Sequence, residues 1–211
     1  MSNAADSAVR ITTPMVVATH NAGKLREIAA LLTPLGLKVV SAGSLSLPEP
    51  VEDGDTFEAN AALKAHAAAQ GSGYTALSDD SGLCVPALDN DPGIYSARWG
   101  GEKKDFNLAM QKVDDALRAR GIETNGTPAY FVCVLALADR DGHLVHMRGE
   151  VHGTLCYPPR GTLGFGYDPM FIPEGYTQSF GEIPAEEKHA MSHRARAFAA
   201  LVHHLKQERA A

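Results

Sequence analysis

The fold class is decided by one stretch, MVVATHNAGKL, at residues 15–25. Residues 15–19 are apolar and rich in β-branched side chains, which predicts a buried strand. Asn21 is a residue type that begins helices, and Leu25, Ile28 and Leu32 then recur at helical spacing. A strand that leads directly into a helix is typical of a fold in which helices pack on a sheet.

Outward from this stretch, helices and strands alternate through the first half of the chain. We expect further strands at 37–41 and 75–78, helices at 55–70 and 103–120, and a last helix capped by Ser192. Residues 129–138 and 143–155 predict a long hairpin that turns at Asp141-Gly142. The pattern indicates an α/β or α+β fold with a mixed sheet. No linker divides the chain, so we expect one two-lobed domain over residues 15–211.

Composition excludes several classes of protein. The chain has 211 residues, 45% of them apolar and 21% charged, which is typical of a globular protein with a real core. Its net charge of −6 argues against a general binder of nucleic-acid backbones. No run approaches 18 apolar residues, which argues against a membrane span. Residues 1–14 are polar and predict a flexible extension, and we expect a cytoplasmic protein.

The three cysteines, Cys84, Cys133 and Cys156, lie far apart in the chain. No two of them have the spacing of a metal or redox motif, and an odd number argues against a disulfide framework. All three lie in apolar surroundings, so we expect buried thiols.

Two adjacent carboxylates follow an apolar strand in the run LSDDSGL at residues 77–83. Neighbouring side chains of a strand point to opposite faces, so only one of the two aspartates can face a given site. Gly82 would let the backbone turn, and we therefore expect the strand to end here with Asp80 at the edge of a cleft. Such an aspartate can hold a divalent cation or orient a water molecule. An ordinary turn would use the same residue types.

An acidic loop precedes the long alanine-rich helix. Glu52 or Asp53 could complete a metal site begun by Asp80, because hard divalent cations take oxygen ligands from more than one loop. Asp55 and Glu58 have the spacing of a helix-capping box, which explains them without a metal.

Two further segments carry charged or aromatic side chains in suggestive positions. The turn over residues 19–24 would present main-chain N–H groups and Lys24 to a phosphate, although a helix start with an exposed lysine explains it equally well. The stretch GFGYDP at residues 164–169 suits a loop that stacks on a planar ring, or else a tight turn with its aromatic rings packed inward.

A cationic cluster lies near the start of the last helix. Lys188, His193 and Arg194 could contact a base or neutralise a phosphate, or they could form a solvated helix start. His189 and His193 are four residues apart, but the sequence offers no third zinc ligand beside them.

Five runs together resemble the inosine triphosphate pyrophosphatase family, also known as the Ham1-like family. They are THNAGK at 19–24, DDSGL at 79–83, PGIYSAR at 92–98, GFGYDP at 164–169, and Lys188 with SHR at 192–194. They follow the family's order and cover nearly the whole chain, from about residue 15 to residue 196. His20 departs from the family, in which many members have glycine.

The resemblance implies an elongated α/β fold with two lobes around a long mixed β-sheet, helices on both sides and the active-site cleft between the lobes. It implies a homodimeric enzyme that uses Mg²⁺ to hydrolyse ITP, dITP and XTP to the monophosphate and pyrophosphate. Asp80 would be the catalytic proton acceptor and would share the metal with Glu52. The substrate-binding residues it implies are Thr19, His20, Asn21, Ala22, Gly23, Lys24, Ser81, Phe165, Gly166, Tyr167, Asp168, Lys188, His193 and Arg194.

Two other functions compete with this one. A Maf-like pyrophosphatase would act on modified pyrimidine nucleotides, and a regulatory module would bind a nucleotide without turnover. We expect neither nucleic acid nor membrane as a partner.

Overall fold

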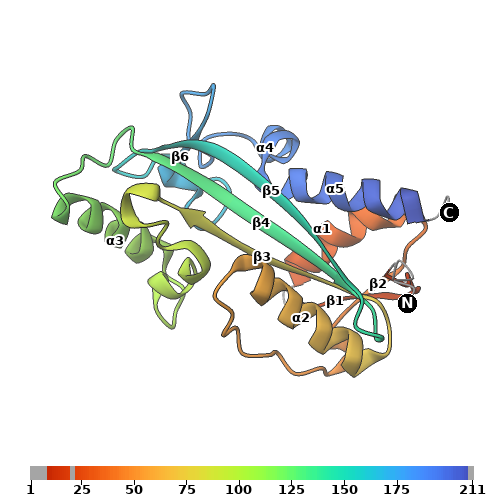
Figure 1. The fold of residues 1–211 in the computed structure, drawn as a ribbon. Coiled ribbons are helices and arrows are strands. Elements are labelled where there is room, and N and C mark those ends of the chain that lie inside the picture. The colour runs from red at the N-terminus through yellow and green to blue at the C-terminus, as the bar shows by residue number, and fades with distance from the viewer. Residues whose placement is uncertain (1–8, 20–21, 209–211) are drawn as a thin grey trace, which may run out of the picture. The chain divides into compact units, whose positions relative to one another are not determined.

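The computed structural model describes residues 9–19 and 22–208 and contains one mixed β-sheet (Figure 1). The strands lie in the order β2-β1-β3-β4-β5-β6. β1 pairs in parallel with both β2 and β3, whereas β5 and β6 are antiparallel. The strands are β1 Met15–Val17, β2 Val39–Ser41, β3 Ala76–Cys84, β4 Pro128–Ala138, β5 Leu144–Leu155 and β6 Phe171–Pro173. The α-helices are α1 Ala22–Leu32, α2 Phe57–Ser72, α3 Phe106–Ala119, α4 Ala185–Met191 and α5 His193–Glu208. The predicted α/β class and mixed sheet are confirmed.

The chain divides into two compact units. Unit 1 comprises Met1–Asp80, Val134–Met147 and Leu201–Ala211, and unit 2 comprises Ser81–Cys133 and Arg148–Ala200. Strands β3, β4 and β5 each contribute residues to both units. The single domain over residues 15–211 and the flexible extension over 1–14 remain predictions.

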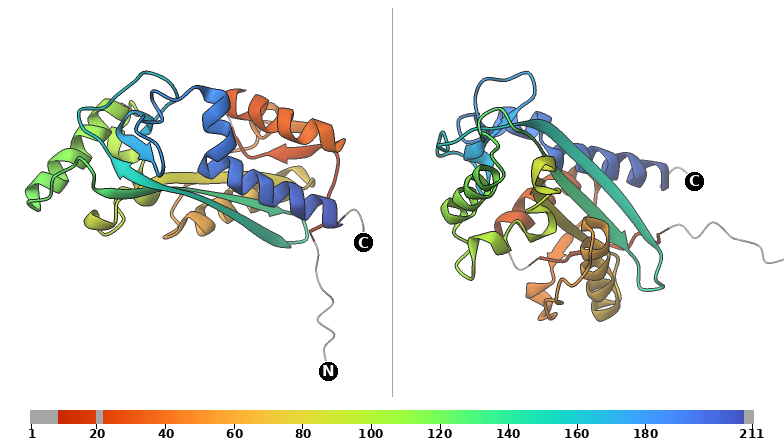
Figure 2. Two further views of the ribbon diagram at one scale, coloured as in Figure 1. Left: turned by 90° about the horizontal axis from the view of Figure 1, so that it is seen from above. Right: turned by 60° about the vertical axis from the view of Figure 1, so that its left-hand side comes forward.

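Unit 1 begins with two crossovers around the central strand β1. The chain runs from β1 through α1 to β2, and then through α2 to β3 on the other side of β1. Because crossovers between parallel strands are right-handed, this strand order places α1 and α2 on opposite faces of the sheet, as Figure 2 shows. Ligands of α/β sheets bind at such a reversal of strand order. The carboxyl end of β1 is therefore a favourable place for a site.

Helix α2 packs closely because its inner face is made of small side chains. Ala61, Ala65 and Ala69 are fully buried. The helix is capped by Thr56, whose side chain accepts the N–H of Ala59 at 3.0 Å. The predicted capping box of Asp55 and Glu58 is therefore wrong, because Thr56 is the cap and the third residue of the helix is Ala59 instead of an acid.

A buried carboxylate organises the hairpin turn of unit 1. Asp139 accepts the N–H groups of Asp141 at 2.9 Å, His143 at 3.0 Å and Arg10 at 3.0 Å. Gly142 completes the predicted turn with a φ of 95°, which favours glycine. Val9 is buried as well. The described part of residues 1–14 is thus tied to unit 1 at the hairpin.

Strand β3 does not end where the sequence analysis placed its end. It continues through the two aspartates to Cys84. Gly82 does not form a turn but allows the segment of Gly93 and Ser96 to pack closely against β3. A Cβ atom on Gly82 would lie 2.2 Å from the carbonyl oxygen of Gly93 and 2.6 Å from Ser96 Oγ. Ser96 Oγ also accepts the N–H of Leu83 at 2.9 Å. Asp80 is consequently held in the middle of a regular strand.

Unit 2 has an aromatic core. Phe131 contacts Phe171 with ring centroids 4.7 Å apart, and Phe171 contacts Phe180 at 5.2 Å. The three cysteines of the chain are buried free thiols, as predicted. Within the described ranges no helix is both long and apolar enough to cross a membrane.

Candidate functional site

Two carboxylates and a lysine meet in unit 1. Asp80 comes from β3, Glu52 from the acidic loop, and Lys64 from the middle of α2. Lys64 Nζ contacts Glu52 Oε1 and lies 3.4 Å from Asp80 Oδ1. The side chains of Lys64 and Asp80 are only 11% and 12% exposed. The predicted pairing of Asp80 with Glu52 is therefore bridged by a cation that the sequence analysis did not identify.

The charges of this group shift the pKa values of its members. Burial raises the pKa of Asp80, Lys64 lowers it and Glu52 raises it again, and the result is a pKa of about 6. Burial alone would lower the pKa of Lys64, but Asp80 and Glu52 outweigh it and raise that pKa above its usual value. Lys64 therefore stays charged, while Asp80 changes protonation close to neutral pH.

One oxygen of Asp80 is left for another partner. Oδ2 is buried and has no hydrogen-bond partner among the described residues, and the same holds for Ser81 Oγ. Buried polar atoms are nearly always paired in native proteins, so an orphaned carboxylate oxygen indicates a missing ligand. Asn60 supports the loop beside it, since its Oδ1 accepts the N–H of Gly54 at 2.9 Å.

The donor set suits a magnesium ion that also binds phosphate. The part of the chain that the structure describes contains no group of three metal-ligating side chains. Mg²⁺ commonly takes one or two carboxylates and completes its octahedron with water and substrate phosphates. Asp80 with its orphaned Oδ2 and Glu52 fit that pattern.

The predicted phosphate turn follows β1 in the same unit. Thr19 is buried, and its N–H donates to the carbonyl oxygen of Val17 at 2.8 Å. His20 and Asn21 lie outside the described residues, and the main chain of residues 22–24 forms the first turn of α1. The first N–H groups of a helix have no partner within it, so this turn can bind an anion.

A second group of predicted residues assembles in unit 2 around Asp168. This carboxylate is 3% exposed, accepts the N–H of Phe165 at 2.7 Å and forms an ion pair with Lys188. A Cβ on Gly164 would lie 2.2 Å from Asp168 Oδ2, and its φ of 74° also favours glycine. The GFGYDP loop is therefore fastened to α4 through one buried carboxylate.

Phe165 presents an aromatic ring to solvent beside two cations. It is 60% exposed. Lys188 Nζ lies 5.5 Å from the centre of the ring, and the guanidinium carbon of Arg194 lies at 5.6 Å. An exposed ring with flanking donors can stack on a planar ligand and bind its polar edge.

Tyr167 and His193 are buried. Tyr167 is 2% exposed, its hydroxyl donates to the carbonyl oxygen of Ser96 at 2.8 Å, and its ring packs edge-on against Phe106. The His193 ring stacks on Phe131 with centroids 4.9 Å apart. The solvated helix start considered for Lys188, His193 and Arg194 is wrong for His193, because the aromatic core covers it.

Residues that the sequence analysis missed have weak sequence signals. Lys64 is the one charged residue in the run AALKAHAAA at 61–69, and a lone cation in an alanine-rich helix could have marked it. Ser96 belongs to the quoted run PGIYSAR, but its role as a bridge between β3 and Tyr167 is visible only in three dimensions.

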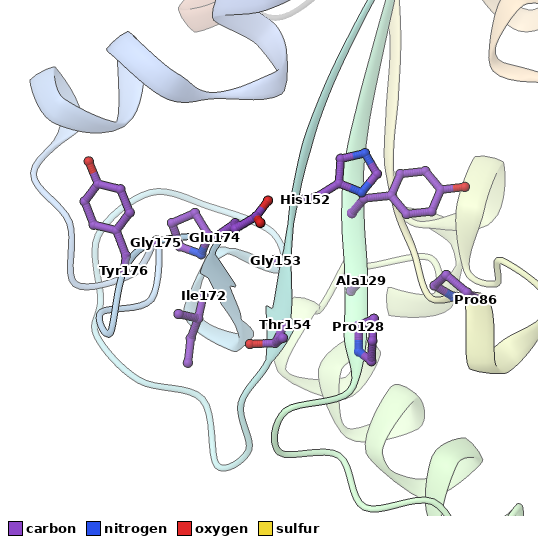
Figure 3. Close-up of a pocket in the computed structure, with 12 residues that line it drawn as sticks. Pro86, Pro128, Ala129, His152, Gly153, Thr154, Ile172, Glu174, Gly175 and Tyr176 are labelled. Atoms are coloured by element: carbon purple, nitrogen blue, oxygen red, sulfur yellow. The ribbon is translucent and has the colours of Figure 1, made fainter.

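A cavity of about 480 Å³ in unit 2 is lined by none of these residues (Figure 3). Its walls are β4, β5, β6 and the turn after β6, with His152, Glu174 and Tyr176 among the polar side chains. The predicted functional groups therefore lie outside this cavity.

Comparison with known proteins gives one consistent result. The model of the Ham1 family matches residues 15–204. A dITP/XTP pyrophosphatase of Zymomonas mobilis subsp. mobilis is 57% identical over 188 residues, which is 89% of this chain and 90% of that protein. A dITP/XTP pyrophosphatase of Brucella melitensis biotype 1 is 54% identical over 196 residues, or 87% of this chain and 89% of that protein. The structure of a HAM1 protein from Coxiella burnetii superposes with a TM-score of 0.87 at 36% identity and covers 93% of this chain and 100% of its own. The predicted family is confirmed, and the chain belongs to the Ham1 family.

Proposed function

We propose that this protein hydrolyses noncanonical purine nucleoside triphosphates, namely dITP, ITP and XTP, to the monophosphate and pyrophosphate. The names of its relatives support the reaction class and the substrates. The observation that carries the proposal is the Asp80 carboxylate, which has a pKa of about 6 and whose buried Oδ2 has no partner among the described residues.

The substrate has two ends of different chemistry, and the chain has a group suited to each. The group of Asp80, Glu52 and Lys64 suits the triphosphate with Mg²⁺ bound to it. When bound, Mg²⁺ would neutralise phosphate charge and strengthen the electrophilic character of phosphorus. The turn over residues 19–24 and the Ser81 hydroxyl would hold phosphate oxygens.

Asp80 would accept the proton of the attacking water. The water oxygen forms a bond to the α-phosphorus, the bond from that phosphorus to its bridging oxygen breaks, and pyrophosphate leaves with the bonding electrons. In the metal-free protein the pKa of Asp80 is about 6, so this carboxylate is ionised at neutral pH and can accept a proton. Lys64 would hold the Asp80 and Glu52 carboxylates in place.

The group around Asp168 suits the base. Phe165 would stack on the purine, and the main chain of residues 165–168 together with Lys188 would line its edge. Arg194 and His193 are donors that would match the 6-oxo group of hypoxanthine or xanthine. Adenine has an amino donor there, and an unmatched buried polar pair costs about 1–3 kcal/mol. Tyr167 would not contact the base and would instead keep the main chain of the loop over residues 164–169 in position.

A substrate panel tests this function. Pyrophosphate release is measured for dITP, ITP and XTP and, as comparison substrates, for ATP, GTP, dTTP and UTP. Each assay is run with Mg²⁺ and again after Mg²⁺ has been removed by chelation. The proposal expects Mg²⁺-dependent release from the first three at about a hundredfold higher kcat/KM than from ATP, because two mismatched polar pairs give that ratio. Preference for dTTP or UTP would favour the Maf-like function. Binding of dITP without any release would favour the regulatory module.

The family resemblance also supports a homodimer in the cytoplasm. Sedimentation equilibrium tests the first part, with twice the chain mass of 22.4 kDa as the expected result. A single species of 22.4 kDa at micromolar concentration would contradict it.

A further inference from the structure

A group of aromatic and cationic side chains in unit 2 is used by none of the steps above. It consists of Tyr95, Arg98, Trp99 and Lys112, which line a cavity of about 370 Å³. Tyr95 follows Gly93 in a short helical turn, Arg98 and Trp99 begin the next turn, and Lys112 comes from α3. We call these four residues the Trp99 pocket.

The side chains of the Trp99 pocket are held in place by packing and by contacts with one another. Trp99 is partly buried and packs against the aromatic core of unit 2. Lys112 Nζ donates to the carbonyl oxygen of Trp99 at 2.9 Å, which fixes the lysine beside the ring. The guanidinium carbon of Arg98 lies 5.1 Å from the centre of the Tyr95 ring. Two cations and two rings are therefore positioned before any ligand arrives.

The local charge contrasts with the charge of the whole chain. Residues 95–112 contain four cations, Arg98, Lys103, Lys104 and Lys112, against two carboxylates, Glu102 and Asp105. The chain as a whole has a net charge of −6. Arg98 and Lys112 are the two of these cations that line the pocket itself.

The chemistry of the pocket specifies its ligand. Tyr95 is 44% exposed, so its ring can stack on a planar ligand. Arg98 and Lys112 supply donors for one phosphate group. A cavity of about 370 Å³ lies at the small end of the range for small-molecule sites, which favours a single nucleotide over an oligonucleotide. We infer that the Trp99 pocket is a second nucleotide site, which binds a nucleoside monophosphate through its base and its phosphate.

The inference does not depend on the proposed hydrolysis, because it requires no turnover and no metal. It can be tested directly, since Trp99 is the only tryptophan of the chain. Inosine monophosphate is titrated into the metal-free protein while tryptophan fluorescence is recorded. We expect a saturable change, with inosine alone and inorganic phosphate alone each binding at least about tenfold more weakly.

Variants separate this site from the group around Asp168. Arg98→Gln and Lys112→Gln should each raise the Kd for inosine monophosphate about tenfold, because each removes a charge-assisted contact. Tyr95→Leu should raise it several-fold through lost stacking. Lys103→Gln is the matched control on the same loop and should change the Kd less than about twofold, and Arg194→Gln should leave it unchanged. Far-UV circular dichroism checks that each variant is folded.

Three results would overturn the inference. One is a fluorescence signal that does not change up to millimolar nucleotide. Another is a Kd that responds to Arg194→Gln and ignores Arg98→Gln, because the ligand would then be bound at the group around Asp168. The last is inorganic phosphate binding as tightly as the nucleotide, which would leave a plain anion site.

Discussion

Two aspartates of unit 1 have opposite environments. Asp139, at the hairpin turn, accepts three main-chain N–H groups, and the ring nitrogen Nδ1 of His143 lies 2.8 Å from its Oδ2. Burial raises the pKa of Asp139, but these donors outweigh it and hold that pKa at about 2. Asp80, in β3, has fewer donors: Lys64 Nζ lies 3.4 Å from Oδ1, Oδ2 has no hydrogen-bond partner in the described chain, and the pKa is about 6.

The difference separates a carboxylate that serves the fold from one that serves the chemistry. A structural carboxylate is surrounded by donors, because an unpaired buried charge destabilises the folded state. A catalytic or metal-binding carboxylate must keep an oxygen available for the substrate or the ion. With fewer donors around it, its pKa lies higher than that of a fully paired carboxylate. The proposed function predicts that each aspartate can be neutralised with a distinct consequence.

The largest effect is on activity. Asp80→Asn should lower kcat for dITP with Mg²⁺ by about 10³-fold or more, because the variant loses both a proton acceptor and a metal ligand. Asp139→Asn should stay within about twofold of wild type at 25 °C, provided that it is folded. Pyrophosphate release by the two purified variants measures both. Similar losses in the two variants would remove the distinction.

The next effect is on stability, and it concerns Asp139. Its pKa falls from 3.8 to about 2 on folding, so the ionised carboxylate stabilises the fold above pH 4, and this stabilisation is lost as the pH falls toward 2. Asp139→Asn should cost about 2–3 kcal/mol of unfolding free energy at pH 7 and almost nothing near pH 2. Urea unfolding of wild type and variant at several pH values measures the cost. A cost that does not depend on pH would contradict the electrostatic origin.

Asp80 should show an effect of the opposite sign and comparable size. Its pKa rises from 3.8 to about 6 on folding, so ionised Asp80 destabilises the metal-free fold above pH 6, and below pH 4 the penalty disappears. Asp80→Asn should therefore stabilise the metal-free protein by about 3 kcal/mol at pH 8 and have little effect at pH 4. A destabilised Asp80→Asn variant at pH 8 would mean that Asp80 is a structural carboxylate like Asp139.

The smallest effect extends the comparison to unit 2. Tyr167 is buried and supports the loop of Phe165 and Asp168 through its hydrogen bond to Ser96. Tyr167→Phe should raise KM for dITP about three- to fivefold with kcat within about twofold, because a hydrogen bond of about 1 kcal/mol is lost from the loop that we assign to the base. Tyr176→Phe is the control on a half-exposed tyrosine. Unchanged KM with a lower melting temperature would make Tyr167 purely structural.

Local patterns in the sequence were sufficient for the fold class and for part of the site. The strand predicted over residues 15–19, the helix after it and the hairpin with its turn at Asp141-Gly142 depend on neighbouring residues, and the structure contains all three, with the strand limited to Met15–Val17. The grouping of Asp80 with Glu52 was predictable from ligand chemistry, because divalent cations take carboxylates from separate segments, and in the structure both carboxylates contact Lys64.

Features that depend on distant contacts were not predictable. Gly82 was interpreted as a turn residue. The structure shows that glycine is required there because the carbonyl oxygen of Gly93 occupies the space that a Cβ atom would need. Lys64 lies in a helix whose alanines give no periodic signal for which face is buried. For Tyr167 the sequence allowed either a ring that stacks on a ligand or a ring packed inward, and the contacts with the core of unit 2 and with Ser96 that decide for the second are visible only in the structure.

The most direct measurement is a ¹³C NMR titration of the aspartate carboxyl groups, with Asp80→Asn and Asp139→Asn used to assign the two resonances. In the metal-free protein, Asp80 should titrate near pH 6 and Asp139 near pH 2. Addition of Mg²⁺ should lower the midpoint of Asp80 and leave that of Asp139 unchanged. An Asp80 resonance that titrates near pH 4, like an exposed carboxylate, and ignores Mg²⁺ would contradict the assignment of Asp80 to the chemistry.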